Sequence, residues 1–546
     1  MKYLRLSLYG WFAVLIGLVL SIPVISIVFS VFQEGQGNWP HLASTVLPRY
    51  VSNSLYLAAT VGVGVTVIGV GSAWLVVMCQ FPGRRLFEWA LILPLAMPAY
   101  VVAYAYTDVL QVSGPVQSLL RDMTGWRFGD YWFPQIRSIG GAITVFIMVL
   151  FPYVYLLSRA AFLEQSVATL EASRVLGKSP TGAFWTVALP MARPAIVVGV
   201  TLALMETLAD FGTVFHFGVQ TFTTGIYRTW ASMGDKVAAA QLSSVLLAFV
   251  AVLLVLERSS RRRAKYFESR SRYTSLSTYQ LTGARRWGAF IFCAIPLMGG
   301  FIAPVAMLMY MHITAGHDLT DPRYISMISN SVMLASIAAV LAVLVSLYLA
   351  FVARTERSPI ALAVNKIASM GYAIPGTMIA VGILYPVAYV DQTLNQLASQ
   401  WFGQQLGLVL TGSFTALILA YLVRFMAVSL NTVSASLGKV TPSMEAAART
   451  LGKGRFQTMR QVHAPLISGG LLTASLIVFV DVMKELPATL IMRPFNFDTL
   501  AIQAYNLAKD ERLTQAATPS LVIVLVGLLP LFILSRQIMR SRTGAH

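Results

Sequence analysis

Charged residues are scarce in this chain. Only 11% of its 546 residues are Asp, Glu, Lys or Arg, whereas 57% are hydrophobic. Soluble globular domains carry about 25% charged residues, so a soluble protein of this length could not cover its surface with so few. The composition therefore excludes a soluble protein and indicates an integral membrane protein.

Cysteine and histidine are also too sparse to suggest a redox or metal centre. The two cysteines, Cys79 and Cys293, each lie at or in an apolar run, with neither a partner nor a ligand spacing nearby. The six histidines are scattered over loops and termini, and no two stand at helical ligand spacing. We therefore expect no disulfide and no high-affinity metal site within the membrane.

Long hydrophobic runs, in contrast, recur along the whole chain. A run of about 20 apolar residues is long enough to cross a bilayer as a helix, whereas a β-barrel would need short, strictly alternating segments. We expect membrane spans at roughly 9–32, 54–79, 87–110, 140–162, 194–215, 237–256, 288–312, 329–353, 367–391, 407–430, 468–491 and 514–535. The sequence thus predicts an all-α polytopic membrane protein with about twelve transmembrane helices.

The net charge of +18 is distributed over alternate loops. The basic residues include Lys2, Arg5, Arg84, Arg85, those of the segment 257–287, Arg536, Arg540 and Arg542. The positive-inside rule places these loops, and with them both termini, in the cytoplasm. The basic segment has neither interleaved aromatic residues nor a zinc spacing, so we expect no nucleic-acid partner.

One polar segment occurs twice, at residues 171–178 (EASRVLGK) and 446–453 (AAARTLGK). Its glycines, Gly177 and Gly452, lie 275 positions apart (452 − 177), which is about half of the chain. Each glycine is followed thirteen residues later by a proline. A repeat at this distance indicates an internal duplication.

The duplication extends beyond this segment. Residues 95–103 match residues 372–380, again at nearly the same offset and in the same direction. The chain therefore consists of two parallel halves, 1–256 and 288–546, joined by the basic cytoplasmic linker 257–287. Each half should contain six spans, and we expect a pseudo-two-fold axis along the membrane normal.

The repeated segments lie in polar, helix-favouring loops at about 163–193 and 438–467. Glycine permits a positive φ and a close approach of the backbone to another surface. The prolines, Pro190 and Pro465, restart a helix in its first turn. One such loop could simply cap the bundle, but two copies with the same Gly-to-Pro spacing favour a docking surface for a partner.

These loops resemble the Glu-Ala-Ala-Gly loop of the type I permease subunits of bacterial ATP-binding-cassette importers. In that family the loop is the coupling helix, which lies in a cleft of the cytosolic ATPase. The resemblance assigns ATPase coupling to Glu171, Ala172, Gly177, Leu189, Pro190, Glu445, Ala447, Gly452 and Pro465. The second loop departs from the pattern, because Ala446 occupies the glutamate position and Ala464 precedes the proline in place of leucine.

The resemblance implies a permease rather than an enzyme. The sequence has no Gly-x-x-x-x-Gly-Lys-Ser/Thr phosphate-binding loop, so ATP and magnesium are expected on a separate ATPase, and this chain is expected to bind no cofactor. The implied partners are two copies of a cytosolic ATPase, one solute-binding protein and the lipid bilayer. The implied location is the bacterial inner membrane, with many passes.

Residues 93–104, 205–214 and 484–490 look like the corresponding stretches of fused ferric-iron permeases. This resemblance implies that the cargo is ferric iron. Thiamine, phosphonates and polyamines stay open as alternatives, because related permeases share much of this core. An ion-coupled secondary transporter also uses parallel repeats and midplane carboxylates, but it has no use for a coupling loop.

Four carboxylates lie in or at the edges of apolar spans, and they are Glu206, Asp210, Asp481 and Glu485. Ionisable groups are costly in the membrane and usually face the bundle interior or an aqueous path, and oxygen ligands suit hard cations. The four residues are therefore candidates for the translocation pathway. Alternatively, Asp210 ends its span, and Glu485 pairs with Lys484 or caps a broken helix before Pro487.

Overall fold

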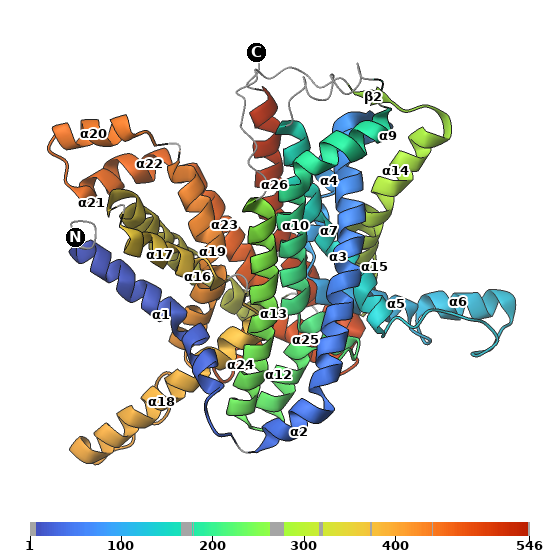
Figure 1. Ribbon diagram of the computed structural model, residues 1–546. Helices are drawn as coiled ribbons and strands as arrows, with labels where there is room; N and C mark the ends of the chain where they lie inside the picture. Colours follow the sequence, from blue (N-terminus) through green and yellow to red (C-terminus); the bar gives the residue numbers. More distant parts are fainter. Residues whose placement is uncertain are drawn as a thin grey trace. The chain divides into compact units, whose positions relative to one another are not determined.

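A computed structural model describes most of the chain (Figure 1). The described residues are 7–35, 37–164, 177, 179–262, 278–315, 320–356, 358–371, 374–438 and 440–543. Within them, the only β-structure is the parallel pairing of β1 (Cys79–Gln80) with β2 (Tyr279–Gln280). The predicted all-α class is confirmed.

Ten helical segments are long and apolar enough to cross a membrane, and up to twelve result if each of two bent pairs forms one span. The ten are α1 (Leu8–Ser30), α3 (Leu47–Met78), α7 (Ile139–Glu164), the run of α9 (Pro180–Ala183), η3 (Phe184–Ala188) and α10 (Leu189–Ala209), α13 (Lys236–Arg262), the run of α14 (Gly283–Leu297), η4 (Met298–Ile302) and α15 (Ala303–Ala315), α16 (Pro322–Glu356), α18 (Gly376–Phe402), α19 (Phe414–Leu437) and α26 (Leu513–Thr543). Each predicted span overlaps one of these segments or one of the bent pairs.

The third span of each half is broken at a proline. The pieces are α4 (Arg84–Ala90), η2 (Leu93–Ala96) and α5 (Ala99–Leu110) in the first half, and α17 (Pro359–Ala368) and α18 in the second. Met97, with φ −91° and ψ 117°, is extended because the ring of the following proline disfavours helical backbone before it. Pro98 and Pro375 then each directly precede a new helix. The span predicted at 87–110 therefore consists of helical pieces that bend by 90° at Pro98.

The remaining elements extend the repeat to the short helices. They are α2 (Asn38–Thr45), α6 (Pro115–Thr124), α11 (Gly212–His216), α12 (Phe222–Ala231), α20 (Pro442–Thr450), α21 (Arg455–Thr458), η6 (Met459–His463), α22 (Ala464–Leu466), α23 (Ser468–Met483), α24 (Pro487–Met492) and α25 (Leu500–Lys509). The pairs α7 and α19, η3 and η6, and α11 and α24 each begin 275 positions apart, the offset of Gly177 and Gly452 (452 − 177).

The chain forms two compact units, and each unit contains parts of both sequence halves. Unit 1 comprises Met1–Ser44, Gly225–Val245 and Asp318–Asn506, and unit 2 comprises Thr45–Thr224, Leu246–His317 and Leu507–His546. In unit 1, α1 packs on α17 and α18, whereas in unit 2, α15 packs on α5 and α26. The first span of each half thus lies with the core of the other half. The boundaries 1–256 and 288–546 describe the repeats and not the compact units.

Small residues bring the helices of unit 2 together. A Cβ atom added to Gly69 of α3 would lie 2.6 Å from Cβ of Val154 in α7, and one added to Gly199 of α10 would lie 2.8 Å from Cα of the same valine. In lipid, apolar area alone does not drive helices together, so close packing at small residues has to do so. This packing fixes α7 and α10, the two helices that flank the first repeated loop.

Candidate functional site

Both repeated loops end in the same backbone arrangement. A five-residue π-helical turn, η3 in the first loop and η6 in the second, is followed by the next residue and then by a proline. The turns close through backbone hydrogen bonds from Leu189 to Phe184 and from Ala464 to Met459. A proline ring collides with the carbonyl four residues earlier in a regular α-helix. The wider turn accommodates both prolines. After Pro190 the helix continues to Ala209, whereas after Pro465 it ends at Leu466 and bends by 78° into α23.

Both repeated glycines adopt the left-handed backbone that favours this residue. The φ angle is +76° at Gly177 and +72° at Gly452. Gly452 follows α20, where the N–H of Lys453 donates to the carbonyl of Ala448 over 3.0 Å, as in a Schellman turn. Among the described residues, a Cβ at either glycine would meet nothing within 4 Å. With respect to these residues, a side chain at either position would therefore cost backbone strain only.

The structure describes the predicted coupling residues of the first loop only in part. Glu171 and Ala172 lie outside the described residues. Leu189 and Pro190 begin α10, where Pro190 is exposed. In the second loop, Pro465 is likewise exposed in α22. The two prolines therefore occupy equivalent, accessible positions at the end of each loop.

Exposed apolar residues lie along α20 and just after it. Met444 and Ala447 in α20 and Leu451 in the following turn are spaced by three and four residues, and Phe456 follows in α21. Leu451 and Phe456 are 77% and 57% exposed. Exposed apolar patches of this kind mark interaction surfaces. Of these residues, only Ala447 was predicted from the sequence, although Met444, Ala447 and Leu451 stand at the i, i+3, i+7 spacing of one helix face.

Glu445 lies on the inner face of α20 instead. Its carboxylate accepts a hydrogen bond from Nε of Arg354 over 2.6 Å. Nε2 of the buried His463, in η6, lies 3.2 Å from the same carboxylate oxygen. The side chain of Glu445 therefore holds the loop together internally, and it is not part of the exposed face on which a partner could dock.

Arg354 connects three elements of unit 1. It lies in the last turn of α16, and its Nη1 donates to the carbonyl of Leu437 at the end of α19 over 2.5 Å. Its Nη2 donates to the carbonyl of Val440, just before α20. At the 277-residue offset (330 − 53) that relates α3 to α16, the equivalent residue is Val77. This network was not predicted, because its members are far apart in the sequence.

Two of the four predicted pathway carboxylates cap equivalent short helices. Oδ1 of Asp210 accepts the N–H groups of Thr213 (2.9 Å) and Val214 (3.2 Å) at the start of α11. Oε1 of Glu485 accepts the N–H of Ala488 over 3.1 Å at the start of α24. A negative side chain satisfies free N–H groups and complements the dipole at a helix N-terminus. The capping alternative considered for Glu485 is therefore the arrangement observed.

Glu485 also forms a buried ion pair, though not with its neighbour in the sequence. Its Oε2 lies 3.0 Å from Nε of Arg424 in α19, and the two side chains are 4% and 12% exposed. Lys484 pairs with Asp481, with 2.9 Å between Nζ and Oδ1. Both carboxylates therefore have a basic side chain as a partner in the structure.

Gly376 provides the space for this ion pair. A Cβ at Gly376 would lie 2.5 Å from Oε1 of Glu485 and 2.9 Å from Nη1 of Arg424. The repeat equivalents of these three residues are Ala99, Asp210 and Val149. The first half thus has a shorter acid, no guanidinium and a methyl group where the second half has glycine. These three differences are consistent with one another, and they make the two halves chemically unlike at this point.

Glu206 differs from the other three carboxylates. It lies one turn before Asp210 in α10 and is half-buried. Within the described part of the chain it forms neither an ion pair nor a side-chain hydrogen bond. The same residues contain no group of three or more His, Cys, Asp or Glu side chains that could hold a metal ion.

Comparison with known proteins identifies the family. The family model described as "Binding-protein-dependent transport system inner membrane component" matches residues 65–272. The molybdenum transport system permease protein ModB of Escherichia coli K12 is 32% identical over 206 residues, which cover 36% of this chain and 87% of ModB. The chain belongs to this family.

Other relatives match the permease over most of its length. The Fe(3+)-transport system permease protein FbpB 2 of Haemophilus influenzae is 26% identical over 529 residues, covering 96% of this chain and 97% of FbpB 2. The ferric transport system permease protein FbpB of Actinobacillus pleuropneumoniae is 23% identical over 514 residues, 90% of this chain and 71% of that protein. A long match to FbpB 2 and a short one to ModB agree with two permease halves fused in one chain. The chain is an all-α, multi-pass membrane permease.

Proposed function

We propose that the permease is the fused transmembrane component of an ATP-driven importer of ferric iron. The iron assignment rests on the similarity to FbpB 2, a Fe(3+)-transport permease, over nearly the full length of both proteins. The importer assignment is supported by one structural observation above all. A left-handed glycine followed by a π-helical turn and a proline occurs twice, at the same offset, in loops that the sequence marks as docking surfaces, whereas the π-helical turn η4 before Pro304 lies within a span and has no such glycine at the equivalent distance before it.

In this proposal, two copies of a cytosolic ATPase dock on the loops at 163–193 and 438–467. On the second loop, Met444, Ala447, Leu451 and Phe456 supply the exposed apolar face. One solute-binding protein delivers the cargo on the opposite side of the membrane. ATP and magnesium bind to the ATPases, so the permease binds no cofactor and catalyses no reaction, and both of its termini are cytoplasmic.

The four carboxylates have different proposed roles. Asp210 and Glu485 hold helix starts, and Asp481 balances Lys484, so these three act on structure. Glu206, which has no such partner among the described residues, is the carboxylate we assign to the cation path. Recognition and affinity for iron then reside in the solute-binding protein.

The proposal is tested by transport in proteoliposomes. The full chain is reconstituted with its ATPase and its solute-binding protein, and uptake of radiolabelled ferric iron is measured with and without ATP. We expect ATP-dependent iron uptake that excess thiamine, polyamine, phosphonate or molybdate does not reduce. Competition by one of these compounds would reassign the cargo. Uptake that follows an ion gradient without ATP would show a secondary transporter instead.

A further inference from the structure

Each half of the permease carries a projecting segment that the coupling and transport roles do not use. Arm 1 comprises residues 112–138 of unit 2 and contains α6. Arm 2 comprises residues 390–413 of unit 1 and contains the C-terminal part of α18. Both helices end at a glycine in the left-handed region, Gly125 with φ +72° and Gly403 with φ +65°. These glycines lie 278 positions apart (403 − 125), so the arms are repeat equivalents.

In arm 1, α6 binds its own following loop through its polar face. Oε1 of Gln117 accepts from the hydroxyl of Tyr131 over 2.8 Å. Nη1 of Arg121 donates to the same hydroxyl over 3.1 Å, and its Nη2 donates to the carbonyl of Val112 over 2.8 Å. The loop is therefore held against the polar side of α6.

The apolar side of α6 is left uncovered. Val112, just before the helix, and Val116, Leu119 and Met123 within it follow one another at spacings of three or four residues. All four are exposed, Met123 to 77%. In a soluble protein, an amphipathic helix turns its apolar side inward. Here the polar side is the one that is covered.

Arm 2 is built in the same way with different residues. The carboxylate of the buried Asp391 accepts the N–H groups of Val409, Leu410 and Thr411 over 3.1, 2.8 and 2.7 Å. The side chain of Asn395 forms two hydrogen bonds with the backbone of Gly407. The loop after α18 is thus folded back onto the polar side of its helix.

The equivalent apolar side of α18 is again open. Val390, Leu394, Leu397 and Trp401 stand 278 positions after Val112, Val116, Leu119 and Met123. Trp401 and its neighbour Phe402 are 74% and 76% exposed. No charged residue occurs between Gln392 and Ser413. Two arms with different sequences therefore present the same uncovered apolar stripe, which we define as these eight equivalent positions.

Within its own unit, each arm lies at the opposite end of a membrane-spanning helix from the coupling loop of the same half. Arm 1 precedes the N-terminus of α7, and the first coupling loop follows its C-terminus. Arm 2 and the second coupling loop flank α19 in the same way. The helices that lead into arm 1 bend by 90° at Pro98. Consequently α6 runs across the direction of α3 (Figure 1), as a helix in the plane of a membrane would.

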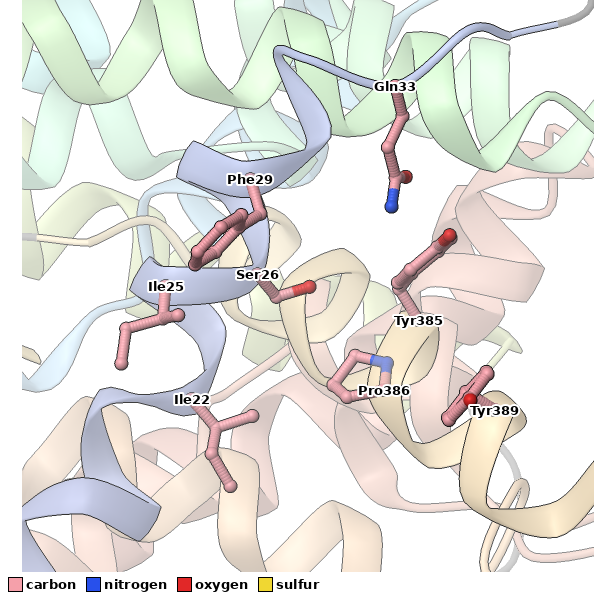
Figure 2. A pocket seen from close by; sticks show the side chains of 8 residues that line it. All are labelled: Ile22, Ile25, Ser26, Phe29, Gln33, Tyr385, Pro386 and Tyr389. Carbon is pink, nitrogen blue, oxygen red and sulfur yellow. The ribbon is translucent and has the colours of Figure 1, made fainter. Parts of the chain in front are cut away.

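An apolar groove of about 340 Å³ lies at the root of arm 2. Figure 2 shows it between α1 and α18, lined mainly by Ile22, Ile25, Phe29, Tyr385, Pro386 and Tyr389. Phe29 and Tyr389 are 65% and 68% exposed, so the groove opens on the outer surface of two membrane-spanning helices. Tyr389 directly precedes Val390, the first residue of the stripe.

We propose that both arms lie in the bilayer interface opposite the coupling loops, with the apolar stripes in the lipid and an acyl chain in the groove. Amphipathic helices lie in this plane with the apolar side among acyl chains. Aromatic side chains, Trp above all, concentrate at this depth. Both arms carry exposed aromatic side chains that would lie at this depth: Trp126, Phe128 and Trp132 in arm 1, and Trp401 and Phe402 in arm 2. Each arm thus anchors its unit in the plane of the membrane interface.

The test uses spin labels on the full chain in nanodiscs. In a background with Cys79 and Cys293 replaced by alanine, the stripe variants are Leu119→Cys and Leu397→Cys. Asp122→Cys and Gln396→Cys, on the polar sides of the same helices, are the matched controls. Labels on the stripe should collide severalfold more with oxygen, which dissolves in lipid, than with a water-soluble nickel chelate. Labels on the polar sides should show the reverse preference.

Two results would overturn the proposal. One is equal nickel accessibility of stripe and control positions in nanodiscs. The other is a stripe that is open to nickel until the solute-binding protein is added and is shielded afterwards, because it would identify a protein-docking surface. All four positions are exposed, so the substitutions remove little packing, and binding of the ATPase checks that each variant is folded. The result is independent of which cargo the permease carries.

Discussion

At the residue scale, the second half of the permease contains an ion pair that the first half lacks. Within unit 1, Glu485 is buried and the side chain of Arg424 is 12% exposed. A buried pair is stable only while both partners stay and their geometry is good, because a single remaining charge is uncompensated. Gly376 supports that geometry because it has no side chain. A methyl group there would lie only 2.5 Å from Oε1 of Glu485.

Replacing Gly376→Ala should therefore destabilise the permease. The new Cβ would lie 2.5 Å from Oε1 of Glu485, so the ion pair must shift. Overpacking of this kind costs about 1–3 kcal/mol. Thermal unfolding in nanodiscs should show a lower midpoint. Ala99→Gly, at the repeat-equivalent position, is the control and should change the midpoint less; equal shifts would contradict the argument.

Neutralising Glu485 and Glu206 in turn should distinguish a carboxylate that stabilises the fold from one that serves transport. Glu485→Gln removes the carboxylate charge that pairs with Arg424, and breaking a buried pair costs about 3–5 kcal/mol, so the folded yield should fall. Glu206→Gln removes no ion pair, so yield should be normal while iron uptake per assembled complex falls. If Glu206→Gln transports at the normal rate per complex, this residue has no role in the path.

Gly452 tests the coupling loop. A valine at φ +72° strains the backbone by about 1–2 kcal/mol, and it adds bulk to the docking side of the loop. Membrane insertion should survive, whereas ATP-dependent uptake should fall. Gly454→Val is the matched control, because Gly454 is exposed in the same loop and its φ is not positive. Equal uptake by the two variants would argue against a special role of Gly452.

At the element scale, the second coupling loop is joined to the bundle by a guanidinium that has no counterpart at the equivalent position of the first half. Arg354 binds the carbonyls at the end of α19 and the carboxylate of Glu445 at once. A displacement of α20 by a docked ATPase would therefore be transmitted to α16 and α19 together. Arg354 is a positioning residue in this arrangement, since it acts through α20.

Arg354→Lys should weaken that transmission. Lysine keeps the charge but lacks the planar fork that serves three acceptors at once. We expect faster amide hydrogen exchange in α20 and a severalfold drop in iron uptake per ATP hydrolysed, with ATPase binding retained. Arg460→Lys, an exposed change in the same loop, is the control. Unchanged exchange and unchanged coupling in Arg354→Lys would refute the positioning role.

The elements were predictable where their signal is local in the sequence. Each span predicted from hydropathy overlaps an apolar helix or a bent pair, and the repeated Gly-to-Pro spacing marked the two places where a left-handed glycine is followed by a π-helical turn. The break at Pro98 was also readable, because a proline within a span disfavours helix before it. The partners of Glu485 and Glu445 were not predictable. Arg424 and Arg354 meet them only through packing of distant helices, and no sequence spacing encodes that contact.

At the scale of the whole molecule, sequence repeats and compact units differ. The duplication is visible in the sequence, but nothing in a hydrophobic run such as that of α1 indicates which core it will join. In the structure α1 packs on α17 and α18, from the other half. Exchange of the first spans makes each unit depend on both halves. A permease cut in the linker 257–287 should therefore need both fragments together to fold.

The topology of the membrane-embedded chain follows from the same arrangement and can be measured by labelling. Ser259, exposed in the basic stretch after the sixth span, should be cytoplasmic by the positive-inside rule. Ser44, exposed in α2 between the first two spans, should lie on the other side. In oriented vesicles, a membrane-impermeant thiol reagent should label Ser44→Cys and Ser259→Cys from opposite faces. The unsubstituted chain, whose two cysteines are buried, supplies the background. Labelling of both variants from one face would require an even number of crossings between them and would refute the twelve-span arrangement.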